Sequence, residues 1–478
     1  MRQSHIFYKF PFPPYSVRSE SMAGDRHGVA TGTGHPALMR YLKACPVAGS
    51  ATSSSQYVGG LCADGRAISP HHRPKTRRLR MRTAIAMPPL ATAPSPQTKG
   101  WCPGALRPML SGDGLVVRVR PHGGWLTAAQ AAGIAALARQ YGSGLLDLTS
   151  RANLQLRGVR PESHADVLQG LHILGLLDSS ADFEARRNIL VSPFWQPDDG
   201  TQHIAAALAL ALTAPDAPAL PGKFGFAVDC GAQAVLRASS ADIRIERGPG
   251  GYTVRADGYA TGACVSAEET VPTAIALAYW FLAQGGGIAG LTRMAALAPQ
   301  HALPQGFQTA TDFSPSGPLP QPEATAAGWL VGVEFGQLQA DTLTALSTLG
   351  ALRLTPWRML LVEGLQHAPE IPGLVTQAFD ARLRVVACTG APGCLQAAAA
   401  TRALARALAP SIPAGQLLHV SGCSKGCAHP RATLTLVATP AGFNLIHNGT
   451  AASAPDLLAL SPETIASHLL PTFHAPRI

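Results

Sequence analysis

The sequence predicts an α+β fold of pseudo-twofold design, in which two β-α-β-β units are each followed by a larger α/β segment. Strand-like and helix-like hydrophobic patterns run in one order before residue 180 and recur in the same order after residue 325. The stretch LDLTSR at 146–151 aligns with LRLTPW at 352–357. A repeat of this kind indicates an internal duplication, in which neighbouring copies bury their apolar faces together.

Both units are predicted from alternation and amphipathic periodicity. In the first unit we expect the strand Gly114–Pro121, the helix Thr127–Tyr141, and the strands Gly144–Leu148 and Asn153–Gly158. In the second unit we expect the strand Trp329–Phe335, the helix Ala340–Leu349, and the strands Ala351–Thr355 and Arg358–Glu363.

Pro-rich stretches and changes in composition suggest the domain boundaries. The predicted parts are an extension over 1–97, a first half-domain over 98–179, an α/β domain over 180–297, a Pro-rich linker over 298–324, a second half-domain over 325–375 and an α/β domain over 376–478.

The formal net charge of +10 belongs to the N-terminal extension. Residues 1–98 hold 13 Lys and Arg against 3 Asp and Glu, whereas the remaining 380 residues hold 25 of each. A body with no net charge argues against a nucleic-acid partner. The extension is predicted to be disordered, because it is basic and lacks hydrophobic periodicity. Its Arg77-Arg78 pair precedes a poor export signal, so we expect translation to begin downstream at Met81 or Met87.

No apolar stretch is long enough to span a bilayer, so a membrane partner is not expected. The nine cysteines form no disulfide framework, which together with the poor export signal favours the reducing cytoplasm.

Four cysteines near the C-terminus form the most specific motif. Cys388 and Cys394 enclose a Gly- and Pro-containing loop, and Cys423 and Cys427 enclose a second short loop. Two such loops brought together by a fold can supply four thiolates to a [4Fe-4S] cluster. Zinc sites usually have tighter C-x2-C pairs, so zinc and unrelated thiols are the lesser alternatives.

A second glycine-rich motif is rejected as a dinucleotide site. Gly285, Gly287 and Gly290 match G-x-G-x-x-G, which requires a preceding strand. Here the helical run Ala274–Ala283 precedes the glycines, so we expect them to end a helix.

Basic residues in motif-like segments are candidate anion ligands, because arginine binds carboxylates through a bidentate fork. They are Arg118, Arg120, Arg151, Arg157, Arg186, Arg187 and Lys223. For any single one of them, ordinary surface ion pairing is the simpler interpretation.

Other residues are less informative. His429 follows the second cysteine pair and suits either a ligand or a packing role, while His419 is expected to be a satisfied strand residue. Cys102 is an isolated thiol without a clear role, and Cys230 and Cys264 are expected to be buried packing residues.

Taken together, these segments resemble the sirohaem-type nitrite and sulfite reductase superfamily over about residues 100–478. The matching segments, in order, are TSRANLQLRG at 149–158, RNI at 187–189, LPGKF at 220–224 and the C-x5-C and C-x3-C cysteine pairs. The resemblance implies a nitrite/sulfite reductase-like architecture in which the two repeated units are ferredoxin-like.

Within the superfamily, the sequence looks most like the precorrin-3B synthase family. The features are GWCPG at 100–104, PM at 108–109, GDGL at 112–115 and SGCSKGCAHP at 421–430. Sirohaem reductases typically carry Asn where this chain has Lys425, and a second basic residue where it has Gly225. These departures count against oxyanion reduction.

The resemblance implies an oxygen-dependent monooxygenase that hydroxylates precorrin-3A at C20 and closes a γ-lactone, in cobalamin biosynthesis. It also implies a [4Fe-4S] cluster, a mononuclear non-haem iron and NADH as the ultimate electron donor. By the same resemblance, the cluster ligands are Cys388, Cys394, Cys423 and Cys427. The tetrapyrrole-binding residues are Arg118, Arg120, Arg151, Asn153, Gln155, Arg187 and Lys223, and the catalytic candidates are Lys223, Arg187, Lys425 and His429.

The sequence leaves two alternative functions open. A sirohaem nitrite or sulfite reductase would bind sirohaem, and a non-catalytic iron–sulfur or zinc module would not need the distant arginines. The expected partners are precorrin-3A, dioxygen and a separate electron-donating reductase, because no dinucleotide motif is left in the chain.

Overall fold

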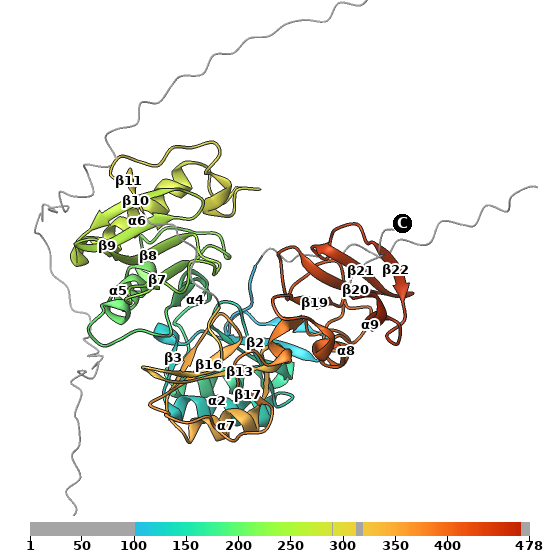
Figure 1. The fold of residues 1–478 in the computed structure, drawn as a ribbon. Helices are drawn as coiled ribbons and strands as arrows, with labels where there is room; N and C mark the ends of the chain where they lie inside the picture. The colour runs from blue at the N-terminus through green and yellow to red at the C-terminus, as the bar shows by residue number, and fades with distance from the viewer. Residues whose placement is uncertain (1–100, 289, 312–318, 470–478) are drawn as a thin grey trace, which may run out of the picture. The chain divides into compact units, whose positions relative to one another are not determined.

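The computed structural model describes residues 101–288, 290–311 and 319–469. The expected extension over 1–97, and part of the expected linker, lie outside these ranges. The described residues form four β-sheets with helices, shown in Figure 1. The mixed α+β architecture predicted from the sequence is therefore confirmed. No described helix is long and apolar enough to cross a membrane.

Two antiparallel sheets, one of five strands and one of six, carry the two β-α-β-β units. The first, sheet A, is ordered β1 (Met109–Ser111), β2 (Gly114–Val119), β5 (Leu154–Val159), β4 (Leu145–Leu148) and β14 (Gln337–Gln339). The second, sheet B, is ordered β12 (Ala324–Thr325), β13 (Gly328–Val333), β16 (Met359–Glu363), β15 (Leu352–Leu354) and β3 (Trp125–Leu126), with β17 (Leu374–Val375) also on β13.

The two units exchange an edge strand. Strand β14 follows the second unit's β13 in the chain, yet it pairs with β4 of sheet A. In return, β3 of the first unit pairs with β15 of sheet B. The helices α2 (Ala128–Tyr141) and α7 (Ala340–Ser347) pack against one another, and both units contribute to one hydrophobic core. Each fully buried Leu or Val in this core contributes about 1.5–3 kcal/mol relative to exposure.

Backbone geometry confirms the duplication at single residues. Ala152 and Arg358 follow the two aligned motifs, and their φ values are 51° and 61°. In both units a threonine hydroxyl near the start of this turn accepts two backbone N–H groups. Thr149 accepts from residues 151 and 153, and Thr355 accepts from residues 357 and 359. A second matched pair, Gly123 and Phe335, also has positive φ, with values of 61° and 54°.

Several helices and strands end at other residues than the sequence predicted. The strand expected to run to Phe335 ends at Val333, because Phe335 adopts a left-handed conformation. The strand expected to start at Arg358 starts at Met359 for the same reason. The strand expected to reach Pro121 ends at Val119, and the helix expected to reach Leu349 ends at Ser347. Helix α2 begins after Thr127, whose hydroxyl caps it in a capping box, close to the prediction.

The two larger α/β segments also share one topology. Sheet C is ordered β11 (Thr309–Ala310), β10 (Thr261–Val265), β9 (Gly251–Ala256), β8 (Ile243–Gly248), β7 (Phe226–Asp229) and β6 (Ile189–Val191). Sheet D is ordered β18 (Val385–Ala387), β19 (Leu418–Ser421), β20 (Thr433–Thr439), β21 (Gly442–Gly449) and β22 (Leu457–Leu460). In each, the three strands that come first in the sequence are parallel and the later ones antiparallel.

The remaining helices are α3 (His164–Ile173), α4 (Ala181–Arg186), α5 (Thr201–Thr213), α6 (Ala267–Ala283), α8 (Arg402–Leu408) and α9 (Ile465–His468). Helix α3 packs against α2, helices α5 and α6 pack against sheet C, and α8 packs against sheet D. Helix α6 directly precedes Gly285, and Gly285, Gly287 and Gly290 have positive φ, as expected of glycines that end a helix. Cys230 is buried as expected, but Cys264 is exposed, so its expected packing role was wrong.

The threonine turns generate a stability prediction. Replacing Thr355, which is fully buried, by the isosteric valine leaves two N–H groups without their acceptor. We expect Thr355→Val to reduce the free energy of unfolding by about 1–3 kcal/mol. Thr348→Val is the control, because Thr348 is exposed and accepts from no backbone N–H of this turn, and we expect a change within about 0.5 kcal/mol. Thermal unfolding of both variants measures the difference, and equal melting temperatures would contradict the prediction.

Candidate functional site

Polar side chains lie in one row across sheet A. Adjacent strands pair Gln337 with Asp147, Asp147 with Gln155, and Gln155 with Arg118. Because side chains alternate along a strand, these four share one face, while neighbours such as Leu146 enter the core on the other. Arg118 and Asp147 are nonetheless buried, so the polar face is covered by other parts of the chain.

Arginines gather at the β2 end of this row. Gln155 Oε1, in its hydrogen-bonding orientation, accepts from Arg118 Nη2 at 2.8 Å and from Nε at 3.2 Å. Burial lowers the pKa of Arg118, and the charge of Arg151 lowers it further. Burial followed by the charge of Arg118 lowers the pKa of Arg120 to about 10. Buried cations that lower one another's pKa are stabilised when an anion binds between them, so this cluster favours an anionic ligand.

The segment that contains Cys102 closes over these arginines. Buried Glu184, on α4, accepts the backbone N–H of Ala105 at 2.5 Å and that of Leu106 at 3.1 Å. The backbone N–H of Arg118 donates to the Gly104 carbonyl, which ties the segment to β2. The Cys102 thiol consequently lies in hydrogen-bonding contact with Arg118 and within electrostatic reach of Arg120.

Arg187 supports the cluster through its Nε and Nη2 groups. Its guanidinium binds Asp178 through Nε at 2.9 Å and Nη2 at 2.7 Å. Nη2 also donates to the Arg120 carbonyl at 2.9 Å. Arg187 is thus placed to hold the backbone of Arg120, whose own Nε has no partner among the described atoms.

Arg151 and Lys223 meet through the main chain. Arg151 Nη2 donates to the Lys223 carbonyl at 2.8 Å, while the Lys223 side chain is exposed. Asn153 is buried, and it directly precedes strand β5 in the sequence. The structure therefore brings Arg118, Arg120, Arg151 and Arg187 together and places Lys223 beside them.

Gly225 is the position at which the resemblance implies a second basic residue in the reductases. A Cβ built at Gly225 would lie 2.6 Å from Asn188 Nδ2 and 3.3 Å from Arg151 Nη1. The Asn188 amide is fixed, because it donates to the Phe224 carbonyl at 2.8 Å. A side chain at position 225 would therefore displace Asn188 or Arg151.

The four motif cysteines follow two adjacent parallel strands. Cys388 comes directly after β18, and Cys423 comes two residues after β19. Because parallel strands end at the same edge of a sheet, the two cysteine loops meet there. The backbone N–H of Gly422 donates to Cys388 Sγ at 3.1 Å, which joins one loop to the other.

The four thiols lie within electrostatic reach of one another. Burial raises the pKa of Cys423 and of Cys427, and the charges of Cys388 and Cys394 raise both further. No three His, Cys, Asp or Glu side chains of the described chain are arranged around a single ion. A cube of four irons is wider than one ion, so four thiols from two loops fit such a cluster as a donor set.

Lys425 and His429 lie with the second cysteine loop, apart from the arginines in sequence. Lys425 is exposed, and burial lowers the pKa of the half-buried His429. His419 corrects an expectation: it is a fully buried strand residue, but neither ring nitrogen has a hydrogen-bond partner among the residues that the structure describes. Burial, followed by the charges of His429 and Arg358, lowers the pKa of His419 to about 4, so its imidazole is neutral.

Several residues of this region were not predicted as site residues. Arg358 Nη2 donates to the Ala428 carbonyl at 2.8 Å, and burial followed by the charge of Arg402 lowers the pKa of Arg358 to about 10. Arg402 Nη2 binds Asp147 at 3.0 Å. Nothing in the local sequence distinguishes these residues, because their contacts join segments more than 60 positions apart.

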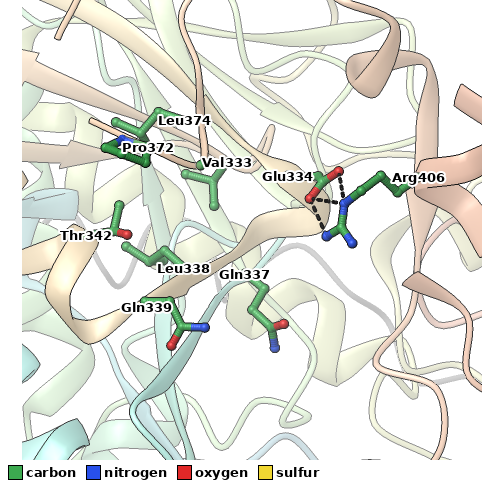
Figure 2. A pocket seen from close by; sticks show the side chains of 10 residues that line it. Val333, Glu334, Gln337, Leu338, Gln339, Thr342, Pro372, Leu374 and Arg406 are labelled. Atoms are coloured by element: carbon green, nitrogen blue, oxygen red, sulfur yellow. Dashed lines mark hydrogen bonds and ion pairs between the residues drawn. The ribbon is translucent and has the colours of Figure 1, made fainter. Parts of the chain in front are cut away.

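Figure 2 shows a separate cavity of about 220 Å³ beside strand β14. Gln337, Gln339 and Thr342 line it, and the Glu334–Arg406 ion pair closes one side with a 2.6 Å contact. A second cavity of about 240 Å³ borders Arg187. Both are smaller than the 300–1,000 Å³ typical of ligand pockets, so neither alone would enclose a large ligand.

Comparison with known proteins assigns the fold. The family model of the nitrite/sulfite reductase ferredoxin-like half domain matches residues 107–172. The solved structure of the Mycobacterium tuberculosis NirA protein aligns with a TM-score of 0.50 at 18% identity, covering 74% of this chain and 79% of that one. The chain has the nitrite and sulfite reductase fold. The half domain matched by the family model spans β2, α2, β4, β5 and nearly all of α3.

Two relatives of known name extend the comparison. The chain is 29% identical to a precorrin-3B synthase from Sinorhizobium sp, over 75% of this chain and 84% of the relative. It is 25% identical to a ferredoxin–nitrite reductase from Synechococcus elongatus, over 68% of this chain and 76% of that enzyme. The resemblance drawn from the sequence motifs is confirmed.

The packing around Gly225 generates a prediction. Gly225→Lys would introduce the basic residue of the reductases into space held by Asn188 and Arg151. We expect the variant to lose about 1–3 kcal/mol of stability from overpacking. Gly222→Lys is the matched control, because nothing lies within 4 Å of a Cβ built at Gly222. Thermal unfolding measures both variants, and a Gly225→Lys protein as stable as the control would contradict this account.

Proposed function

We propose that this chain is an oxidoreductase that hydroxylates precorrin-3A at C20 with dioxygen and closes a γ-lactone, giving precorrin-3B. One oxygen atom of dioxygen enters the substrate. The other is reduced to water by two protons and two electrons, and the electrons come ultimately from NADH. Similarity to a precorrin-3B synthase over 84% of that relative carries this proposal. The buried arginine cluster supports it, because a precorrin carries many acetate and propionate groups.

The arginines would hold the substrate. Arg118, Arg120 and Arg151 present guanidinium groups whose pKa values burial lowers, so each is stabilised when a substrate carboxylate approaches. Gln155 orients the Arg118 fork, and Arg187 holds the backbone of Arg120. Asn153 and the exposed Lys223 lie at the margin of this group, where Lys223 can approach a bound carboxylate.

The cysteine edge would hold the metal centre. We assign Cys388, Cys394, Cys423 and Cys427 as ligands of a [4Fe-4S] cluster, because the two loops that carry them meet at one edge of sheet D. Burial raises the pKa of Cys423 and of Cys427, so binding to the cluster would displace their protons. When bound, this cluster, together with a mononuclear non-haem iron, would supply the single electrons that activation of dioxygen requires. Lys425 beside the cluster loop offers a positive charge, and the neutral His429 can accept a proton there.

Electrons would come from a separate reductase. The G-x-G-x-x-G sequence of this chain ends helix α6 and does not follow a strand, so it does not form a dinucleotide site. A partner protein that oxidises NADH would therefore pass electrons to the cluster.

A sirohaem nitrite reductase is the second candidate, favoured by the similarity to the Synechococcus elongatus enzyme. The packing at Gly225 argues against it, because no second basic residue can stand beside Lys223 without displacing Asn188 or Arg151.

The first experiment measures iron, acid-labile sulfide and the absorption spectrum of protein purified without oxygen. We expect iron, sulfide and broad cluster absorption without a sharp tetrapyrrole band, and loss of iron in Cys394→Ser. Cys264→Ser is the control, since Cys264 is an exposed cysteine outside the motif. A sirohaem spectrum would make the protein an oxyanion reductase, and protein without iron would contradict the cluster.

Removal of one cluster arginine tests substrate binding. Arg118→Gln keeps much of the side-chain volume but removes the charge, and we expect kcat/KM for precorrin-3A to fall by about 10–100-fold, as for loss of a charged hydrogen bond. Arg160→Gln is the control, because Arg160 is exposed and lies just beyond β5. Full activity of folded Arg118→Gln would count against an active-site role for Arg118.

A further inference from the structure

The turn between β1 and β2 contacts the first cysteine loop. Three donors converge on the Gly393 carbonyl, next to Cys394. Ser111 Oγ donates at 2.6 Å, Arg157 Nη2 at 2.8 Å and the Gly112 backbone N–H at 3.3 Å. These donors come from positions more than 230 residues away in the sequence, so only the tertiary fold brings them to the loop.

Arg157 is held in place from the other side. Asp113 accepts from its Nε at 3.0 Å and from its Nη2 at 2.7 Å, which is the bidentate arrangement that fixes a guanidinium most firmly. Asp147 lies 3.6 Å from Arg157 Nε. Arg157 is itself buried, with 5% of its surface exposed, so its charge is screened poorly by solvent.

Gly112 adds a steric constraint. A Cβ at this position would lie 2.0 Å from the Pro392 carbonyl oxygen, which belongs to the cysteine loop. Backbone atoms cannot move aside as a flexible side chain can, so any larger residue at position 112 pushes the loop away. The turn and the loop therefore fit together only with glycine at this place.

We propose that Ser111, Gly112, Asp113 and Arg157 form a clamp on Gly393 that positions the Cys388–Cys394 loop and adjusts the reduction potential of its metal centre. The part that concerns the potential rests on the proposed function, whereas the positioning of the loop does not. Gln155, two residues before Arg157 on the same strand, contacts Arg118. The clamp therefore lies about 7 Å along β5 from the arginine cluster.

The charges of the clamp predict the direction of its effect. Reduction by one electron makes the centre more negative, so a nearby cation favours the reduced state and an anion opposes it. Arg157 and Asp113 balance each other as an ion pair. Loss of the Asp113 charge removes one negative charge and raises the potential, although Asp147 still lies 3.6 Å from Arg157. Loss of the Arg157 charge leaves Asp113 unbalanced and lowers the potential, while Asp147 keeps Arg402 as its partner.

A redox titration with dithionite, followed by electron paramagnetic resonance of the iron-loaded protein, tests this. We expect a higher midpoint potential in Asp113→Asn and a lower one in Arg157→Gln, with Arg160→Gln unchanged as the exposed control on the same chain segment. A merely structural defect would not move the two variants in opposite directions. Shifts of the same sign, or no shift in either variant, would overturn the electrostatic role.

Alkylation of the metal-free protein tests the positioning without the cluster. We expect Gly112→Ala to speed modification of Cys388 and Cys394 severalfold in mass spectrometry, while Cys423 and Cys427 keep their rates as internal references. Gly222→Ala is the matched control, since a Cβ there meets nothing within 4 Å.

The two experiments separate the two proposals. Wild-type protein that binds no iron would contradict the assignment of the cluster, whereas the alkylation rates would still test whether the clamp positions the Cys388–Cys394 loop. Unchanged rates at Cys388 and Cys394 in Gly112→Ala would overturn the clamp even if the iron cluster is present.

Discussion

The buried carboxylate of Asp147 is the contact on which much of this structure depends. It accepts from Arg402 at 3.0 Å and from Gln337 at 3.4 Å, and it lies 3.6 Å from Arg157. These partners belong to the cysteine-bearing segment, to the exchanged strand β14 and to strand β5. A buried charge must be paired, so this one carboxylate holds three distant parts of the chain in register.

The equivalent position in the second unit carries the opposite charge. Arg353 replaces Asp147 and donates to the carbonyls of Pro193 and Trp195, at the end of β6. At this matched position each repeated unit therefore contacts an α/β segment through a buried ionised residue, but the signs differ. Arg353 also binds Glu363 at 2.6 Å, and Leu330, Met359 and Leu361 form an apolar cluster on the same sheet. The two copies thus share their backbone but differ in the polar side chains that they carry on it.

Much of the organisation could be predicted, because it rests on local patterns. The repeated units, helix α2, the glycines after α6 and the pairing of the cysteines in two loops all follow from periodicity and short spacing. The ends of the elements were less accessible. Left-handed turns at Phe335 and Arg358 occur in residues that rarely adopt them, so composition did not indicate them. The imidazole of His419, which has no hydrogen-bond partner within the described part of the chain, likewise depends on packing from elsewhere in the fold.

The sequence by itself determined which chemistry the chain can carry: four thiols in two short loops, arginines in two adjacent strand segments and glycine at position 225. The tertiary structure decided which of these groups work together. It alone joined Arg157 to Gly393, Asp147 to Arg402 and Cys102 to Arg118. The physical reason is that burial and charge pairing act through space, so their partners are set by sheet register and packing rather than by separation along the chain.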